Sequence, residues 1–434
     1  MDEIWSLELL RPLTSIDQIF WRVNHDNNHF LNSIYLYLVG PDASPLIQRG
    51  LSVALGVATI AVAAMTAAAR GRWTMIATSL LFAVSYPMVH YGSEARGYAG
   101  LVLFTLACVL LLERRLDGRG STLAFAAAIL LGFLSHLTML EAAVVLAVWA
   151  TWMVWLRTRR LARTVVEVGW IFIPAGLAVL PLAIGVVVGA KLFGFSVGGV
   201  SPFTLPAFAD GYGGMIRYLF GLPSWIGNWA CIFAAWVPVG VSAVIWRDRR
   251  SGLYVIGIVG LPMLMAAARL PNLEFPRYFL VSATLLLLWA GEVLGRGLDA
   301  GGKHRLLAAG GLVAVLMGTA VSLLSFYEYG RGSYSAIVER MTRDGSATYA
   351  SNHDFRTGMV VDHFAARLDR QASLVPQGKV CAERPAWLIL EGPPDNQAQH
   401  VTPEANCTLA YERVAASASW GLSGLGWTLY RRVD

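Results

Sequence analysis

Residues 46–69 read LIQRGLSVALGVATIAVAAMTAAA, an apolar run of 24 residues that ends at the basic turn Arg70-Gly71-Arg72. Built as a helix that rises about 1.5 Å per residue, such a run is about 36 Å long. This length exceeds the hydrocarbon core of a bilayer, which is about 30 Å thick. The run therefore predicts a transmembrane helix with a cationic end.

More apolar runs follow it along the chain. Together they predict about ten spanning helices, at residues 46–69, 73–90, 98–113, 121–135, 138–157, 164–189, 225–246, 252–269, 277–295 and 304–326. The composition agrees, because 56% of the 434 residues are hydrophobic and 14% are charged, whereas an ordinary soluble domain has about 25% charged residues. The sequence predicts an α-helical polytopic membrane protein and excludes a disordered or simple soluble chain.

The loops between these runs alternate in charge. Five short loops on one side carry most of the basic residues, namely Arg70, Arg72, Arg114, Arg115, Arg119, Arg157, Arg159, Arg160, Arg163, Arg247, Arg249, Arg250, Arg296, Lys303 and Arg305. Membrane proteins keep such loops in the cytoplasm. Residues 1–45, the loops near 91–97 and 190–224 and the tail from 327 are therefore predicted to be extracytoplasmic. The net charge of +6 then reflects membrane orientation, and no nucleic-acid partner is expected.

A soluble composition begins after the last apolar run. Helix-like segments at 334–343 and 354–368 alternate with strand-like segments at 347–350, 387–390, 409–414 and 427–431, which predicts a small α/β domain. We therefore divide the chain into an outer amphipathic loop with an acidic pair (1–45), a membrane domain of about ten helices (46–326) and an extracytoplasmic α/β domain (327–434). Cys381 and Cys407 are either a disulfide, which an oxidising compartment permits, or two free thiols.

The predicted topology places residues 1–45 outside, although no apolar segment precedes Asp2 in this sequence. Two explanations stay open. Either translation starts upstream and supplies a first span, or the first helical hairpin pulls the short amino-terminal segment across the membrane.

Ionisable residues gather on the predicted outer side. They form four groups: Asp2-Glu3, His25-Asp26-Asn27-Asn28-His29, Ser93-Glu94-Ala95-Arg96-Gly97-Tyr98, and Glu274-Phe275-Pro276-Arg277-Tyr278. Charges at the edge of a span are costly without partners or water, so they indicate function. For Arg277 an interfacial anchor is an equal alternative. Glu94 and Arg96 would point to different faces of a helix, so Arg96 is expected to need another anion, such as a bound phosphate.

A carboxylate and arginines at an outer membrane surface suit group transfer from a lipid-phosphate donor. The carboxylate removes a proton from an acceptor hydroxyl, and the cations stabilise the departing phosphate. Each task needs its own residue type, because an arginine that is always protonated cannot act as a base.

The histidines allow two interpretations. His25 and His29 lie four residues apart with Asp26 between them, which is a candidate metal set, but hydrogen bonding or loop positioning explains them as well. His136 is either an interfacial residue or a ligand contact. The sequence contains no Walker loop, which excludes nucleotide-driven pumps.

The ordered set of motifs resembles the GT-C glycosyltransferases of the protein mannosyltransferase and aminoarabinose transferase group, glycosyltransferase family 39 type. The motifs are Asp2-Glu3-Ile4-Trp5-Ser6-Leu7, Asp26-Asn27-Asn28-His29-Phe30-Leu31, Ser93-Glu94-Ala95-Arg96-Gly97-Tyr98, Ser135-His136 and Pro276-Arg277-Tyr278-Phe279. The resemblance covers residues 2 to about 326. It implies a multi-pass enzyme of the bacterial cytoplasmic membrane. Such an enzyme transfers a hexose or pentose from a polyprenyl phosphate to a glycan, lipid or protein acceptor on the extracytoplasmic face, with inversion.

The resemblance also implies roles for single residues. It makes Asp2 the catalytic carboxylate, with Glu3 beside it. It assigns the binding of donor phosphate or substrate to Glu94, Arg96, Tyr98, Arg277, Tyr278, His29 and His136. The chain departs from the family pattern at Phe30 and Leu31, where prolines commonly follow the histidine. No cofactor is fixed, and a divalent cation remains an open requirement with His25, Asp26 and His29 as candidate ligands.

A lipid or sugar transporter or flippase without transferase activity is the alternative function. Transporters usually show related halves with helices broken at the midplane, and the sequence shows neither. A scaffold whose tail binds a partner would leave the acidic pair and the Glu94-Ala95-Arg96 motif unexplained. The identities of the sugar and the acceptor, and the oligomeric state, stay open.

Overall fold

A computed structural model describes residues 2–196, 198–403 and 407–434, which fall into two compact units. One unit is Pro12–Ser322, and the other joins Met1–Arg11 to Leu323–Asp434. The amino-terminal segment therefore folds with the tail, although the whole membrane region separates them in the sequence.

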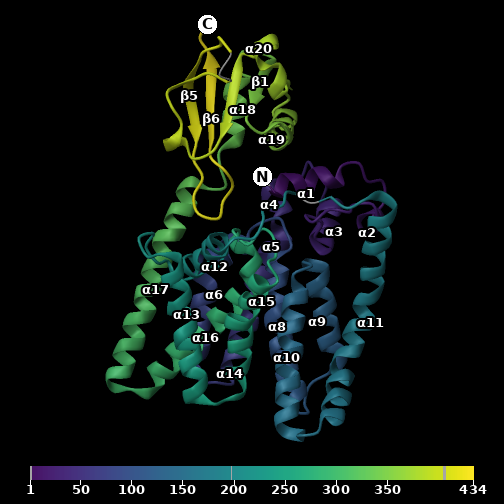
Figure 1. Cartoon of the computed structure of the whole chain (residues 1–434), viewed down its shortest axis with the longest axis vertical. Coiled ribbons are helices and arrows are strands. Elements are labelled where there is room, and N and C mark those ends of the chain that lie inside the picture. The colour runs from purple at the N-terminus through teal and green to yellow at the C-terminus, as the bar shows by residue number, and fades with distance from the viewer. Residues whose placement is uncertain (1, 197, 404–406) are drawn as a thin grey trace. The chain divides into compact units, whose positions relative to one another are not determined.

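The unit Pro12–Ser322 is built from helices (Figure 1). They are α2 (Gln18–Trp21), α3 (Phe30–Val39), α4 (Pro45–Gln48), α5 (Gly50–Ala68), α6 (Arg72–Val84), α7 (Tyr86–Gly92), α8 (Tyr98–Leu116), α9 (Thr122–Ser135), α10 (Met139–Thr158), α11 (Leu161–Phe193), α12 (Leu205–Phe220), α13 (Asn228–Trp246), α14 (Arg249–Tyr254), the π-helical turn η1 (Val255–Gly260), α15 (Leu261–Ala267), the 3₁₀ turn η2 (Pro276–Phe279), α16 (Leu280–Ala300) and the first part of α17 (Gly302–Tyr329), whose residues from Leu323 belong to the other unit. Helix α5 packs on α6 and α8, α8 packs on α9, and α6 packs on α16.

Each predicted apolar run contains a helix. Seven helical stretches of the described residues are long and apolar enough to cross a membrane, namely Gly50–Ala68, Met139–Thr158, Leu161–Phe193, Asn228–Trp246, Arg249–Ala267, Pro276–Ala300 and Gly302–Met341. The predicted helix at 73–90 is broken at Ser85, whose ψ of 126° is not helical. Pro87 explains the break, because a proline inside a helix lacks the N–H and clashes with the carbonyl four residues earlier, whereas it is tolerated in the first turn of α7.

Helix α12 corrects the prediction of a long outer loop at 190–224. It buries an apolar face that includes Phe208, Tyr212 and Met215. Gly211 is required there, because a Cβ at this position would lie 1.9 Å from the Leu273 carbonyl oxygen. The apolar residues of α12 recur with helical spacing instead of forming a continuous run, so a search for long apolar runs misses this helix.

Buried ion pairs join several helices of this unit around Arg250, which is 1% exposed. Its Nη2 donates to Glu113 Oε2 at 2.5 Å and to the Thr66 carbonyl oxygen at 2.6 Å. Its Nη1 pairs with Glu292, which also accepts a hydrogen bond of 2.7 Å from the Tyr254 hydroxyl. These residues come from α5, α8, α14 and α16, so the pairs connect four helices.

Asp248 extends this ionic cluster. It caps α14 by accepting from the Ser251 N–H at 3.0 Å. It also pairs with Arg70 at 2.8 Å and with Arg296. The positive charges of Arg70, Arg250 and Arg296 thus equal in number the negative charges of Glu113, Asp248 and Glu292.

The unit formed by the two ends of the chain contains a six-stranded sheet. Its elements are α1 (Asp2–Leu10), α18 (Tyr334–Met341), β1 (Ala347–Ser351), α19 (Asp354–Arg367), β2 (Ala372–Leu374), η3 (Gln377–Lys379), α20 (Val380–Glu383), β3 (Trp387–Glu391), η4 (Pro394–Asn396), β4 (His400–Val401), β5 (Tyr411–Ser417) and β6 (Trp427–Arg432). The strand order is β2-β1-β3-β6-β5-β4, with β1 parallel to β2 and β3 and the other pairs antiparallel. The predicted small α/β domain is confirmed, but the short strands β2 and β4 and the four-residue helix α20 were not predicted.

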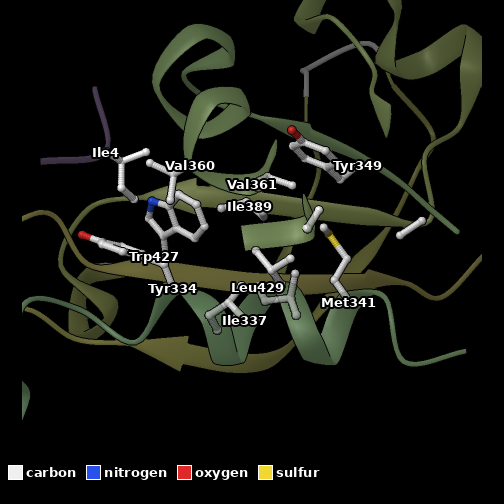
Figure 2. Packing of buried hydrophobic residues seen from close by; sticks show 13 residues of the cluster. Ile4, Tyr334, Ile337, Met341, Tyr349, Val360, Val361, Ile389, Trp427 and Leu429 are labelled. Carbon is white, nitrogen blue, oxygen red and sulfur yellow. The ribbon is translucent and has the colours of Figure 1, made fainter. Parts of the chain in front are cut away.

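Two cores lie on opposite faces of this sheet, because successive residues of a strand point to opposite sides. Ile389 and Val360 belong to the core under α18 and α19, which Figure 2 shows with Trp427 and Tyr334. Leu388 belongs to the other core, with residues of α20 and the following loops. A disulfide joins Cys381 to Cys407 on this second side, with their Cα atoms 5.6 Å apart.

Helix α1 packs on α19. Ile4 is buried in the core that α19 covers, as Figure 2 shows, and Trp5 meets Phe355 edge to face at 5.4 Å. The Glu8 carboxylate lies 3.3 Å from Nδ1 of His363. This hydrogen bond is the main cause that holds the pKa of Glu8 below its ordinary value.

Candidate active site

The polar segment around His25 is fixed by hydrogen bonds to the backbone of Ser196 and Gly198. His25 forms an isolated parallel β-bridge with Ser196, and the Asp26 N–H donates to the Ser196 carbonyl oxygen at 3.2 Å. The Gly198 N–H donates to the Asp26 carboxylate at 3.3 Å. The buried Asn28 amide donates to the carbonyl oxygen of Val23 at 2.8 Å. The segment is therefore held both by the backbone of Ser196 and Gly198 and by the residues that precede it in the chain.

Arg96 lies at the centre of the site and is 7% exposed. Its Nη2 donates to Asn27 Oδ1 at 2.6 Å, and its guanidinium lies 4.7 Å from the ring centroid of Tyr98. Its Nη1 lies 3.5 Å from the Glu94 carboxylate, which is 3.7 Å from Nε2 of His90. The guanidinium therefore contacts an amide, a carboxylate and an aromatic ring.

The approach of Glu94 to Arg96 corrects the expectation that the two side chains diverge. That expectation assumed helical backbone. Residues 93–97 instead form a turn between α7 and α8, and the Arg96 N–H donates to the Glu94 carbonyl oxygen at 2.6 Å. A turn brings residues two apart to the same side, so the two charges come into contact.

Two imidazoles and a tyrosine stack beside Arg96. The ring centroids of His29 and His136 lie 4.6 Å apart, and those of Tyr98 and His136 lie 4.8 Å apart. Burial, then His136 and the charges of Arg96 and Arg277, lower the pKa of His29 well below its ordinary value. Burial and the same two arginines lower the pKa of His136. Both imidazoles are therefore neutral near pH 7.

Arg277 belongs to the same electrostatic neighbourhood, because its charge acts on both histidines. It lies in η2, directly before α16, and its guanidinium is 4.6 Å from the ring centroid of Phe275 and 5.7 Å from that of Tyr278. The site therefore combines two arginines with two neutral imidazoles.

Glycines allow the close approach of α8 to α9 under this stack. A Cβ at Gly97 would lie 1.7 Å from the Ser135 carbonyl oxygen, and one at Gly100 would lie 2.2 Å from Ser135 Oγ. His136 follows Ser135 directly, so the contact also sets the height of its ring against Tyr98.

Gly97→Ala is expected to lower the free energy of unfolding by about 1–3 kcal/mol, as is usual when a methyl group is forced into a packed contact. Thermal unfolding in detergent measures the change. Gly176→Ala is the matched control, because a Cβ at Gly176 of α11 meets no atom within 4 Å. Equal stability of the two variants would show that α8 and α9 tolerate a wider separation.

The structure brings most of the predicted site residues together in the unit Pro12–Ser322. These are His25, Asp26, His29, Glu94, Arg96, Tyr98, His136, Arg277 and Tyr278. Asp2 and Glu3 lie in the first turn of α1, in the other unit, and both are half-buried. Their catalytic role stays a prediction.

The candidate metal ligands do not form a metal site. His25 Nδ1 lies 2.8 Å from Asp26 Oδ1, whereas the His29 ring stacks on His136. Over residues 2–196, 198–403 and 407–434, no group of three His, Cys, Asp or Glu side chains is placed to hold a metal ion.

Two contributors were missed from the sequence. Asn32 donates to the Ala95 carbonyl oxygen at 2.7 Å and so fixes the turn that carries Arg96. His90 approaches the Glu94 carboxylate, and its place one helical turn before Glu94 was a signal that could have found it. Asn32 left no such signal, because an asparagine in an apolar helix has many explanations.

Comparisons with known proteins identify the fold. No protein-family model and no curated protein sequence matches the chain. The solved structure of ArnT from Cupriavidus metallidurans in the apo state is similar, with a TM-score of 0.52 and 13% identity over 99% of this chain and 92% of that chain. ArnT from the same organism bound to undecaprenyl phosphate gives a TM-score of 0.42 and 16% identity, covering 93% and 86% of the two chains. The first likeness shows that the chain has an ArnT-like fold, which agrees with the predicted α-helical polytopic fold with a small carboxyl-terminal domain.

Proposed function

We propose that this protein is a membrane glycosyltransferase that transfers a sugar from a polyprenyl phosphate to an acceptor hydroxyl, with inversion at the anomeric carbon. The ArnT-like fold supports the enzyme class, and the predicted motifs support the donor. The binding of undecaprenyl phosphate by ArnT is a property of that protein, and we propose a donor of the same class here.

The observation that carries the proposal is the setting of Arg96. Its guanidinium is held by the Asn27 amide and the Tyr98 ring, and the charge of Arg277 acts on the same histidines. Arginine presents its N–H groups in a rigid planar fork that matches a phosphate. The buried Arg96, which also contacts the Glu94 carboxylate, and the half-buried Arg277 supply two cations that are suited to hold an anionic lipid headgroup.

The proposed reaction forms one bond and breaks one. The acceptor hydroxyl oxygen attacks the anomeric carbon while a carboxylate, which we assign to Asp2 with Glu3 beside it, takes the hydroxyl proton. The bond between the anomeric carbon and the phosphate oxygen breaks, and the polyprenyl phosphate leaves with the electron pair. Arg96 and Arg277 stabilise the charge on this leaving group.

We propose that the site faces outward from a bacterial cytoplasmic membrane. The alternation of basic loops supports this orientation. The disulfide between Cys381 and Cys407 supports it independently for the α/β domain, because disulfides persist in oxidising compartments.

Arg96→Ala is expected to weaken binding of polyprenyl phosphate by about 10- to 100-fold, the range for losing hydrogen bonds to a charged group. Titration of the purified protein in nanodiscs with polyprenyl phosphate measures the dissociation constant. Arg269→Ala, at an exposed position, is the matched control and should keep the wild-type constant. Unchanged binding by folded Arg96→Ala would remove Arg96 from the donor site.

The same nanodiscs separate a transferase from a flippase. A transferase releases polyprenyl phosphate as a radiolabelled sugar appears on an acceptor. A flippase moves the intact donor between leaflets and leaves its glycosidic bond unbroken.

A further inference from the structure

The α/β unit has a feature that the transfer reaction does not use, at the carboxyl ends of its parallel strands. From β1 the chain passes through α19 to β2 on one side of β1, and then through α20 to β3 on the other side. Val360 of α19 packs on one face of the sheet and Val380 of α20 on the other. Such a reversal is a topological switch point, where open α/β sheets leave a crevice that binds ligands.

A cavity of about 350 Å³ lies at this switch point. This volume falls within the range of small-molecule sites, which is about 300–1,000 Å³. Leu388 and Leu390 of β3 contribute an aliphatic surface, and Ser351, Asn352, Gln377 and Thr402 contribute neutral polar groups.

The frame of the cavity is fixed. The Asn352 amide donates to the Glu391 carbonyl oxygen at 3.1 Å and accepts from the Glu391 N–H at 2.8 Å. Ser351 Oγ donates to Thr357 Oγ1 at 2.7 Å. The disulfide of Cys381, which directly follows the cavity-lining Val380, ties α20 to the segment at Cys407. These contacts preorganise the walls.

Two polar side chains of the cavity can hydrogen-bond a ligand. Gln377 and Thr402 are exposed at the cavity, and within the part of the chain that the structure describes neither side chain has a hydrogen-bond partner. An amide and a hydroxyl both donate and accept, so they pair with a ligand that does the same.

The lining excludes other ligand classes. No described lysine, arginine, aspartate or glutamate lines the cavity, which disfavours anions and cations. Its polar groups disfavour a hydrocarbon chain. Its floor is β3, which is paired on both sides by β1 and β6, so a peptide cannot add there as a strand.

We propose that this cavity binds a neutral saccharide unit, with hydroxyls paired to Gln377 and Thr402 and a C–H face on Leu388 and Leu390. If the proposed function holds, on which this inference rests, the saccharide is part of the acceptor. The α/β unit is then an acceptor-docking domain. Acceptor binding at this cavity then raises the effective concentration of the acceptor during transfer.

Saturation-transfer NMR on the full-length protein in nanodiscs tests the assignment, with the methyl glycosides of glucose, galactose and mannose as probes. We expect transfer to at least one of them and a weaker signal with glucuronate. Gln377→Trp fills the cavity from its exposed rim and should reduce the signal by at least about fivefold. Gln377→Ala and Thr402→Ala, which add no bulk, should each weaken binding about 2- to 10-fold.

Ser373→Ala, at an exposed position on β2 outside the cavity, is the matched control and should keep the wild-type signal. Three results would each overturn the assignment. They are no saturation transfer to any of the three glycosides, a stronger saturation-transfer signal with glucuronate, or an undiminished signal in Gln377→Trp. Glycoside binding does not involve the donor, so the two proposals fail separately. A wild-type protein that binds glycosides but transfers no sugar contradicts only the proposed function.

Discussion

Asp2→Asn is expected to lower turnover by about a hundredfold or more, as is usual for the loss of a general base. Asparagine keeps the shape of the side chain but cannot take the acceptor proton. Ile4 and Trp5 should still dock α1 on α19, because the substitution leaves their contacts unchanged. Donor binding should also survive, since the base acts on the acceptor. Initial rates at saturating donor and acceptor, with a separate donor titration, measure both quantities.

Asp42→Asn is the matched control for this prediction, because Asp42 is an exposed acid of the same predicted outer segment. It should keep turnover within about twofold, the effect expected of a surface substitution. Wild-type turnover by folded and inserted Asp2→Asn would show that Asp2 is not the base. The assignment would then pass to Glu3 or Glu94.

Glu292→Gln is expected to lower the free energy of unfolding by about 3–5 kcal/mol, the cost of removing one partner from a buried ion pair. Glu292 is 0% exposed and pairs with the guanidinium of Arg250, which is itself 1% exposed. The neutral amide leaves this buried positive charge with fewer counterions. Thermal and denaturant unfolding of the purified protein in detergent measure the loss.

Asp299→Asn provides the control on the same helix, because Asp299 lies exposed near the end of α16. Its effect should stay within about 0.5 kcal/mol, as for ordinary surface substitutions. Equal stability of the two variants would mean that Glu113 alone compensates Arg250.

The fold could be predicted largely from the sequence. The apolar run at 46–69 appears as α5, and the helix-like segment at 354–368 appears as α19. Both patterns are local, because the length of an apolar run and its periodicity depend only on neighbouring residues. Helix α12 escaped the prediction, since its apolar residues repeat with helical spacing within a polar segment.

The candidate site could be predicted only in part. The motifs that contain His29, Arg96 and His136 stood out, because charged and polar groups are rare in an apolar chain. The sequence could not show that the Asn27 amide orients Arg96 or that Gly97 lets α8 approach Ser135. Those contacts join segments that are distant along the chain.

The sequence by itself determined the membrane class, the order of helices and the small α/β domain, because hydropathy and its periodicity depend only on residues that are close in the sequence. Only the tertiary structure decided which charges meet. Arg70, Arg250 and Arg296 follow the pattern of cytoplasmic loop charges in the sequence, yet they pair with Glu113 and Glu292 in a cluster around the buried Arg250. The physical reason is range, since an ion pair needs side chains of different helices within about 4 Å, and no local pattern encodes that distance.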